Sequence, residues 1–334
     1  MKDNALYFYY NGGTIMLYAE QTMSSSYLPE GELFYSKANR EFLSCEIMLR
    51  RAMEQSCILE ANAVLCDKSF DLTVDLGCMK GYIPRAEAAY SPDGSTVRDI
   101  AVITRVGRPV CFKIIGFEQR DGELCAILSR KEAQKEYCQN HLSALTPGDI
   151  IDARVTHLEQ FGAFCDIGCG VISLLPVDAI SVSRISHPRD RLKSGTKIRT
   201  VVKSVDKESG RICLSHRELL GTWEENADQF SASQTITGIV RGVEDYGIFI
   251  ELAPNLAGLA EYRDDIAVGQ TVSVYIKSII PDRMKIKLAI IDLCPAASMQ
   301  NKFHYFIEPD VTHIDYWRYS PCTSDKIIES RFTE

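Results

Sequence analysis

The residues with the clearest chemistry are two phenylalanines and a run of cations in the middle of the chain. Phe161 and Phe164 lie three positions apart, and strict strand alternation would place their rings on opposite faces. Gly162 between them allows a bulge or strong twist that brings both rings to one surface. From Arg184 to Arg211 there are nine basic and three acidic residues, so this segment carries +6 and the rest of the chain −14. Such rings and cations are suited to single-stranded nucleic acid; the alternative is that the rings are core and the cations a solvated rim.

The residues around this pair have the pattern of a small β-barrel. Short apolar runs separated by glycine-containing turns predict five strands within about 70 residues. The predicted strands span residues 148–157, 161–168, 170–175, 197–205 and 211–215. We expect them to form a closed or nearly closed barrel, because closure removes unpaired strand edges.

The same order of elements recurs on both sides of this segment. Downstream, residues 246–252, 269–277 and 285–288 match its second, fourth and fifth strands. Upstream, residues 70–77, 107–113 and 126–129 repeat the pattern more weakly. Three copies of one unit explain this order better than one large sheet.

Helices and less regular ends complete the predicted organisation. An amphipathic helix is expected from Ser36 to Gln55, and a second from Lys131 to Leu145. Thr222-Trp-Glu-Glu225 has the form of a capping box that starts a short connector helix. A hairpin is predicted around Asn11-Gly12-Gly13, and Met23 is an alternative start. The aromatic residues 295–334 are expected to pack back on the body.

Composition excludes several classes of protein. With 334 residues, 46% of them hydrophobic and 25% charged, the chain is typical of globular proteins rather than disordered ones. The net charge of −8 excludes a uniformly basic nucleic-acid binder but not a local basic face. No apolar run reaches the ~18 residues of a membrane helix, and no export signal is present, so the cytoplasm is expected. Five cysteines in strand-like runs are predicted to be buried reduced thiols: Cys66, Cys111, Cys125, Cys165 and Cys213.

Enzyme, metal and cofactor motifs are weak in this sequence. There is no phosphate-binding loop, and Gly168-Cys-Gly170 lacks the third glycine of a dinucleotide fingerprint. Cys165 and Cys169 with His157 suggest a metal set, but no Cys-x-x-Cys pair exists and buried thiols are the better interpretation. His313-Ile-Asp315 has the residue types of an acid–base pair, although a structural or solvated histidine is favoured. We therefore expect no catalytic site, no metal and no cofactor.

Residues 148–217 resemble the RNA-binding module of bacterial ribosomal protein S1. The resemblance rests on the Gly148-Asp opening, Phe161-Gly-Ala-Phe164, Val205-Asp206 and Arg211-Ile-Cys-Leu-Ser215. Repeated modules span roughly residues 57–293, and longer strings are similar to the short S1-like proteins of Gram-positive bacteria. The resemblance implies a mainly β fold of three tandem five-stranded OB-type (S1) barrels with connecting helices.

The resemblance also implies where RNA is contacted in the second copy. Phe161, Phe164, Asp206 and Arg211 match the family's RNA-facing positions, whereas the family's histidine position is placed on Ser173. In the third copy, Tyr246 and Phe249 match the aromatic pair, Lys285 takes the arginine position and Glu261 replaces the histidine. Lys203 and Lys277 complete the candidate RNA-binding set.

The first copy matches the family least. It keeps Phe70, but Thr73 and Pro84 stand at the other two positions. The net charges are +2 for residues 147–216, −2 for 231–293 and −1 for 57–130. Because phosphate neutralisation supplies much of the affinity for RNA, the copies rank second, third, first, and the first is interpreted as structural or protein-binding.

These interpretations give a domain plan and an expected function. The plan comprises an extension (1–35), a helix (36–56), a degenerate first barrel (57–130), a connector helix (131–146), the second barrel (147–216), a connector helix (217–230), the third barrel (231–293) and an aromatic-rich extension (294–334). We expect a non-catalytic, cytoplasmic protein that binds single-stranded RNA in translation, with mRNA and the small ribosomal subunit as partners. One alternative is a protein-interaction adaptor that docks on the ribosome or the RNA-decay machinery. Another is a catalytic RNA-processing or metabolic protein that carries the barrels as accessory modules.

Overall fold

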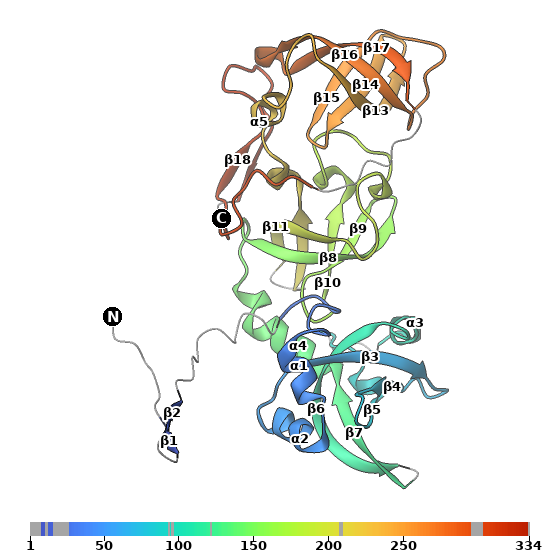
Figure 1. The fold of residues 1–334 in the computed structure, drawn as a ribbon, viewed down its shortest axis with the longest axis vertical. Coiled ribbons are helices and arrows are strands. Elements are labelled where there is room, and N and C mark those ends of the chain that lie inside the picture. The colour runs from blue at the N-terminus through green and yellow to red at the C-terminus, as the bar shows by residue number, and fades with distance from the viewer. Residues whose placement is uncertain are drawn as a thin grey trace. The chain divides into compact units, whose positions relative to one another are not determined.

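Three closed five-stranded barrels dominate the computed structural model of the chain (Figure 1). This confirms the prediction of a mainly β protein with tandem barrels. The structure describes residues 8–10, 13–15, 27–92, 94, 97–120, 122–206, 210–294 and 303–332. The chain forms two compact units, Met1–Ser143 with Gly168–Val171, and Ala144–Ile167 with Ile172–Glu334.

The first barrel closes in the order β3-β4-β5-β7-β6. Its strands are β3 (Leu59–Cys66), β4 (Leu72–Asp75), β5 (Lys80–Ile83), β6 (Pro109–Arg120) and β7 (Glu123–Ser129). Fully buried Leu72, Phe112 and Leu128 fill its interior, and the short helix α3 (Asp99–Ile103) adds Val102 to this core. The barrel therefore has its own apolar core.

The helix predicted over residues 36–55 is wrong as a single element. It is two helices, α1 (Lys37–Phe42) and α2 (Glu46–Glu54), separated by an extended residue at Cys45. The Ser44 hydroxyl donates a hydrogen bond to the Glu41 carbonyl oxygen, which satisfies the end of α1 instead of continuing it. The helix predicted from Lys131 to Leu145 is α4 (Arg130–Asn140), which ends five residues earlier than predicted.

The second barrel closes in the order β10-β12-β11-β8-β9. Its strands are β8 (Ile150–Glu159), β9 (Gly162–Asp166), β10 (Ile172–Pro176), β11 (Lys197–Asp206) and β12 (Arg211–Ser215). Burial alternates along β12, where Ile212 and Leu214 are buried and Arg211 is exposed. This alternation separates an apolar interior from the outward surface described below.

The third barrel repeats this topology. Its strands are β13 (Thr235–Glu244), β14 (Gly247–Ala253), β15 (Leu256–Ala260), β16 (Thr271–Ile280) and β17 (Lys285–Leu293). It is entered through α5 (Trp223–Ala227), whose predicted capping box is confirmed. The Glu225 amide donates to the Thr222 hydroxyl at 3.2 Å, and the Thr222 amide donates to the Glu225 carboxylate at 2.7 Å. Trp223 then joins the core of the barrel.

The described part of the C-terminal extension packs back on the second unit, as predicted. Trp317 on β18 (Tyr316–Arg318) and Tyr319 lie in the core of the third barrel. β18 pairs with β19 (Glu329–Arg331), and Tyr305 packs against a small cluster around Val201. Residues 303–332 therefore contribute side chains to the apolar clusters of the second unit.

The remaining expectations on termini and thiols have mixed outcomes. β1 (Phe8–Tyr10) pairs with β2 (Gly13–Ile15), which confirms the hairpin, while Met23 lies outside the described residues. All twelve cysteines are free thiols. Of the five predicted to be buried, Cys66 and Cys213 are only half-buried. Within the residues that the structure describes, no helix is long and apolar enough to cross a membrane.

Candidate nucleic-acid interface

A row of outward-facing side chains runs across all five strands of the second barrel. The register pairs His157 with Phe164, Phe164 with Leu174, Leu174 with Cys213, and Cys213 with Ser204. Each of these side chains is half-buried or exposed. Residues next to them along β9, β10 and β12 are buried in the barrel interior. These five residues therefore mark the outer face of the barrel, and the other candidate residues are located relative to them.

Phe161 and Phe164 lie on this surface beside each other. Their ring centroids are 5.9 Å apart with an interplanar angle of 88°, and Phe161 is 56% exposed. This geometry excludes the alternative that both rings are barrel core. An edge-to-face pair of this kind keeps one aromatic face open to solvent, which is what base stacking requires.

Of the bulge or strong twist that Gly162 allows, the bulge does not occur. The register shift lies on β8, between Val155 and His157, and Phe161 precedes β9 in the hairpin turn. Gly162 is required for a different reason, because a Cβ there would lie 2.6 Å from the backbone oxygen of Leu175. The two rings share a surface because one belongs to the turn and the other to the strand.

Cationic candidates occupy the same face of the barrel. Arg211 is exposed and lies on β12 two residues before Cys213, so both point outward. Lys203 is the extra residue at the register shift of β11 between Val202 and Ser204, and it is exposed. Asp206 pairs with Arg211 in the register of the β11–β12 hairpin. The structure thus brings Arg211, Lys203 and Asp206 together on β11 and β12, the two strands that carry Ser204 and Cys213 of the row.

Ser173 does not belong to this surface, and its prediction as an RNA contact is wrong. Its side chain is 5% exposed, and it pairs with Cys165 in the barrel interior. Equivalent register positions show the correct match: Phe164 pairs with Leu174 as Phe249 pairs with Leu259, so Pro176 corresponds to Glu261. Sequence reasoning placed the histidine position three residues too early, because the turn before β10 gives no register signal.

Two of the nine cations in the segment from Arg184 to Arg211 are used internally. Arg191 is 5% exposed and binds the Glu251 carboxylate through both guanidinium branches. The side chain of Arg199 donates to four backbone oxygens of the C-terminal extension, those of residues 307, 308, 309 and 311. Lys207 lies outside the described residues. The basic surface is therefore smaller than the charge count predicts.

His157 is a residue of this surface that sequence reasoning did not assign to RNA. Its ring lies 6.5 Å from that of Phe164, nearly parallel at 21°, and its Nε2 lies 2.6 Å from the Glu159 carboxylate. The sequence signal was ambiguous because the β8 register shift decides which face His157 occupies.

The third barrel presents the equivalent surface with different charges. Tyr246 is 70% exposed and meets Phe249 at 6.0 Å and 86°, the same arrangement as the phenylalanine pair. Lys285 is exposed at the position of Arg211, two residues before Lys287. Lys277, the extra residue at the β16 register shift, forms a 2.8 Å ion pair with Glu261. Its cation is partly neutralised where RNA phosphates would bind.

The first barrel covers its aromatic faces with its own arginines. Arg85 lies over the Phe70 ring at 5.1 Å, and Arg120 lies over the Tyr82 ring at 4.4 Å. Thr73 occupies the register position of Phe164, as predicted, because it pairs with Tyr82 as Phe164 pairs with Leu174. These cation–π contacts use the faces that a base would need.

Other candidate chemistry has structural explanations. Burial raises the pKa of the Cys165 thiol to about 12, so it is a poor metal ligand at neutral pH. Within the described residues, no group of three or more His, Cys, Asp or Glu side chains is arranged to hold a metal. His313 ties the C-terminal extension to the second barrel through Asp149 at 2.6 Å and contacts Asp315 at 3.2 Å. This contact agrees with a structural role for the histidine.

Comparisons with known proteins agree with this geometry. The model of the S1 RNA binding domain family matches residues 145–217. The chain is 30% identical to small ribosomal subunit protein bS1 of Leuconostoc lactis over 233 residues, 67% of this chain and 51% of that protein. It is also 30% identical to bS1 of Staphylococcus aureus (strain COL) over 258 residues, 72% of this chain and 63% of that protein. The chain thus spans about half to two thirds of the length of these relatives.

A solved structure covers a similar share of the chain. A multidomain protein with nucleic acid binding domains from Streptococcus pneumoniae matches 71% of this chain and 74% of its own, at 14% identity and a TM-score of 0.24.

Proposed function

We propose that this chain, an S1-like protein, is a non-catalytic protein that binds single-stranded RNA in translation. Its partners are mRNA and the small ribosomal subunit, and its compartment is the cytoplasm. Binding needs neither a metal nor a cofactor. RNA is held by stacking of bases on exposed rings and by contacts of phosphates with lysine and arginine.

The observation that carries this proposal is that the solvent-accessible rings of Phe161 and Phe164 lie on the same outer face of the barrel as Lys203 on β11 and Arg211 on β12. Stacking on an aromatic face contributes about 1–3 kcal/mol per base and tolerates any sequence, because every base has a π-face. Cations add a contribution that weakens as salt rises, because bound phosphates release counterions. The surface thus has both components needed to hold an unpaired strand, in a family named for RNA binding.

The three barrels contribute unequally in this proposal. The second carries the main site, with Phe161, Phe164, Lys203, Asp206 and Arg211 in contact with RNA. The third adds a weaker site through Tyr246, Phe249, Lys277 and Lys285, because Glu261 competes for the cation. The first adds none, because arginines cover its rings. A weak site on the same chain still raises the overall affinity through its high effective concentration.

Binding of labelled RNA to the full chain tests the proposal. Unstructured single-stranded RNA of about 20 nucleotides is titrated at several salt concentrations, with a duplex of the same composition as the matched competitor. We expect the affinity for labelled RNA to fall as the salt concentration rises. Unlabelled single-stranded RNA should displace the labelled strand much better than the duplex does. An absence of salt-sensitive binding would contradict the proposal and favour the protein-interaction adaptor.

The role in translation has a separate test. Two relatives are named small ribosomal subunit proteins, and that name is the support for this part of the proposal. We expect the full chain to sediment with small ribosomal subunits and to release from them in high salt. If the wild-type chain sediments with a nuclease and not with small ribosomal subunits, its role would instead be in RNA decay.

A further inference from the structure

The ring of His157 faces the aromatic pair of the second barrel in a way that neither other barrel repeats. His157 and Phe164 are register partners on β8 and β9, with ring centroids 6.5 Å apart and planes within 21° of parallel. Phe161 meets Phe164 edge-on at 88° instead. The near-parallel partner of Phe164 is therefore a histidine on the neighbouring strand.

The two rings form an offset aromatic pair, because their 6.5 Å centroid separation lies within the range of about 4.5–7 Å for such pairs. Stacked bases in nucleic acids are about 3.4 Å apart along the strand, so a base between two flat rings needs their planes about twice that distance apart. One ring must therefore move aside to admit a base. The His157 side chain is 66% exposed, so it is the ring that can move.

We propose that His157 and Phe164 form a clamp that holds one unpaired base of the RNA between their rings. The inference rests on the proposed function, and it assigns to the second barrel a base site formed by β8 and β9. The base stacks on both rings, while Phe161 contacts its neighbour or its sugar. Stacking on two faces gives this nucleotide more affinity than its neighbours receive.

The surroundings explain why the ring comes from β8 in this chain. Pro176 occupies the β10 position where a stacking histidine would stand, so β10 supplies no π-face beside Phe164. Glu159, two residues after His157, contacts Nε2 at 2.6 Å and holds the imidazole beside Phe164 before RNA binds. The β8 register shift turns His157 to the outer face.

The other two barrels lack this clamp at the equivalent position. In the first barrel Leu65 pairs with Thr73, and in the third Gly242 pairs with Phe249. A Cβ on Gly242 would lie 3.6 Å from the Phe249 ring, an ordinary contact, so a side chain fits there. The third barrel therefore offers a position at which the clamp can be built.

The test compares His157→Ala, His157→Phe and Phe164→Ala in the full chain. The probe is a single-stranded RNA with one 2-aminopurine, whose fluorescence falls when the base stacks. We expect His157→Ala to weaken binding about five- to tenfold and to reduce quenching at one position of the probe. His157→Phe keeps a flat ring and should restore both.

Gly242→His supplies the converse measurement. In a chain that also carries Phe161→Ala and Phe164→Ala, the new histidine should strengthen the remaining RNA binding several-fold. Gly242→Ala in the same background is the matched control and should leave it unchanged.

The outcomes separate the clamp from the proposed function. If Phe164→Ala weakens binding but His157→Ala matches the wild type in affinity and quenching, RNA binding stands and the clamp is wrong. If none of the variants changes RNA binding, the proposed function fails at this site and the clamp with it. Failure of His157→Phe to restore what His157→Ala loses would show that the histidine acts through hydrogen bonding rather than stacking.

Discussion

Lys277 on β16 donates a 2.8 Å hydrogen bond to the carboxylate of Glu261, the residue that follows β15 by one position. This bond lowers the pKa of Glu261 and so favours its ionised carboxylate. Glu261 stands where Pro176 stands in the second barrel, and Lys277 corresponds to Lys203. The third barrel thus has the aromatic platform of the second but neutralises one of its cations internally.

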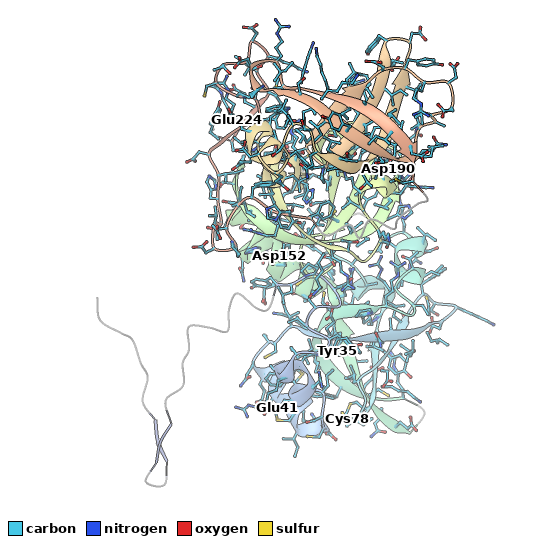
Figure 2. All side chains as sticks on the ribbon, turned by 45° about the horizontal axis from the view of Figure 1, so that its top comes forward. Tyr35, Glu41, Cys78, Asp152, Asp190 and Glu224 are labelled. Carbon is cyan, nitrogen blue, oxygen red and sulfur yellow. The ribbon has the colours of Figure 1, made fainter. Side chains whose placement is uncertain are left out.

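Glu261→Gln should therefore strengthen RNA binding by the third barrel. The substitution removes a charge that repels phosphate and releases Lys277 to contact RNA. In a chain that carries Phe161→Ala and Phe164→Ala, we expect a several-fold lower Kd and a steeper salt dependence. Glu224→Gln on α5, labelled in Figure 2, removes an equal charge from an exposed helix position and is the matched control. Equal effects of both substitutions would show that only net charge matters.

Arg211→Ala should weaken RNA binding and reduce its salt dependence. Removing one phosphate contact lowers the slope of log K against log[salt] by about 1. Lys326→Ala, which removes an exposed cation of the C-terminal extension, should leave the slope unchanged. An unchanged slope for Arg211→Ala would remove Arg211 from the site.

Arg191→Ala should act on stability, although Arg191 belongs to the same cation-rich segment as Arg211. The substitution removes one of the two arginines that pair with buried Glu251 and leaves Arg241 as the other. Breaking a buried ion pair lowers the free energy of unfolding by about 3–5 kcal/mol. Urea unfolding should show this loss, whereas Arg211→Ala should keep the wild-type midpoint. A stable Arg191→Ala chain with weakened RNA binding would reverse this assignment.

His216 should make the second unit sensitive to mild acid. Burial lowers the pKa of His216 to about 4, although its Nδ1–H donates to the Ile180 carbonyl oxygen. The unfolded chain binds this proton below about pH 6.5, so stability is complete above that pH and falls as pH drops toward 4. The loss across this window is about 3 kcal/mol.

Urea unfolding of wild-type and His216→Gln chains between pH 4 and pH 7 checks this effect. The variant should be less stable at neutral pH but should show a flatter dependence on pH. His313→Gln is the control with the opposite sign. A hydrogen bond with Asp149 raises the pKa of His313, so its contribution is present at low pH and is lost as pH rises through that pKa. Parallel pH profiles for wild type and His216→Gln would exclude His216 as the cause.

The strands and their order were predictable because the signals are local. Arg211–Ser215 was predicted with the bounds that the structure has, since an alternating apolar pattern follows a Gly-containing turn. The two-part capping box at Thr222 is equally local. The break between α1 and α2 was missed because the Ser44 hydroxyl competes for a helix carbonyl, which an apolar periodicity does not reveal.

The site was harder to predict because it depends on register and tertiary contacts. Ser173 was placed outside because one residue of register decides the face, and the hairpin turn before β10 hides that register. Arg191 and Arg199 were counted as surface cations, but their partners lie 60 or more residues away in sequence. His157 was weighed only as a metal ligand beside Cys165 and Cys169, and its place next to Phe164 was missed because it depends on the β8 register shift.

RNA binding by the full chain that carries Phe161→Ala and Phe164→Ala is the decisive measurement. We expect the binding free energy to weaken by about 1–3 kcal/mol per lost stack, while the variant stays folded at the assay temperature. The pair Tyr246→Ala and Phe249→Ala should weaken binding less. Wild-type affinity in the phenylalanine variant, with its fold intact, would contradict the central claim that these rings hold the RNA.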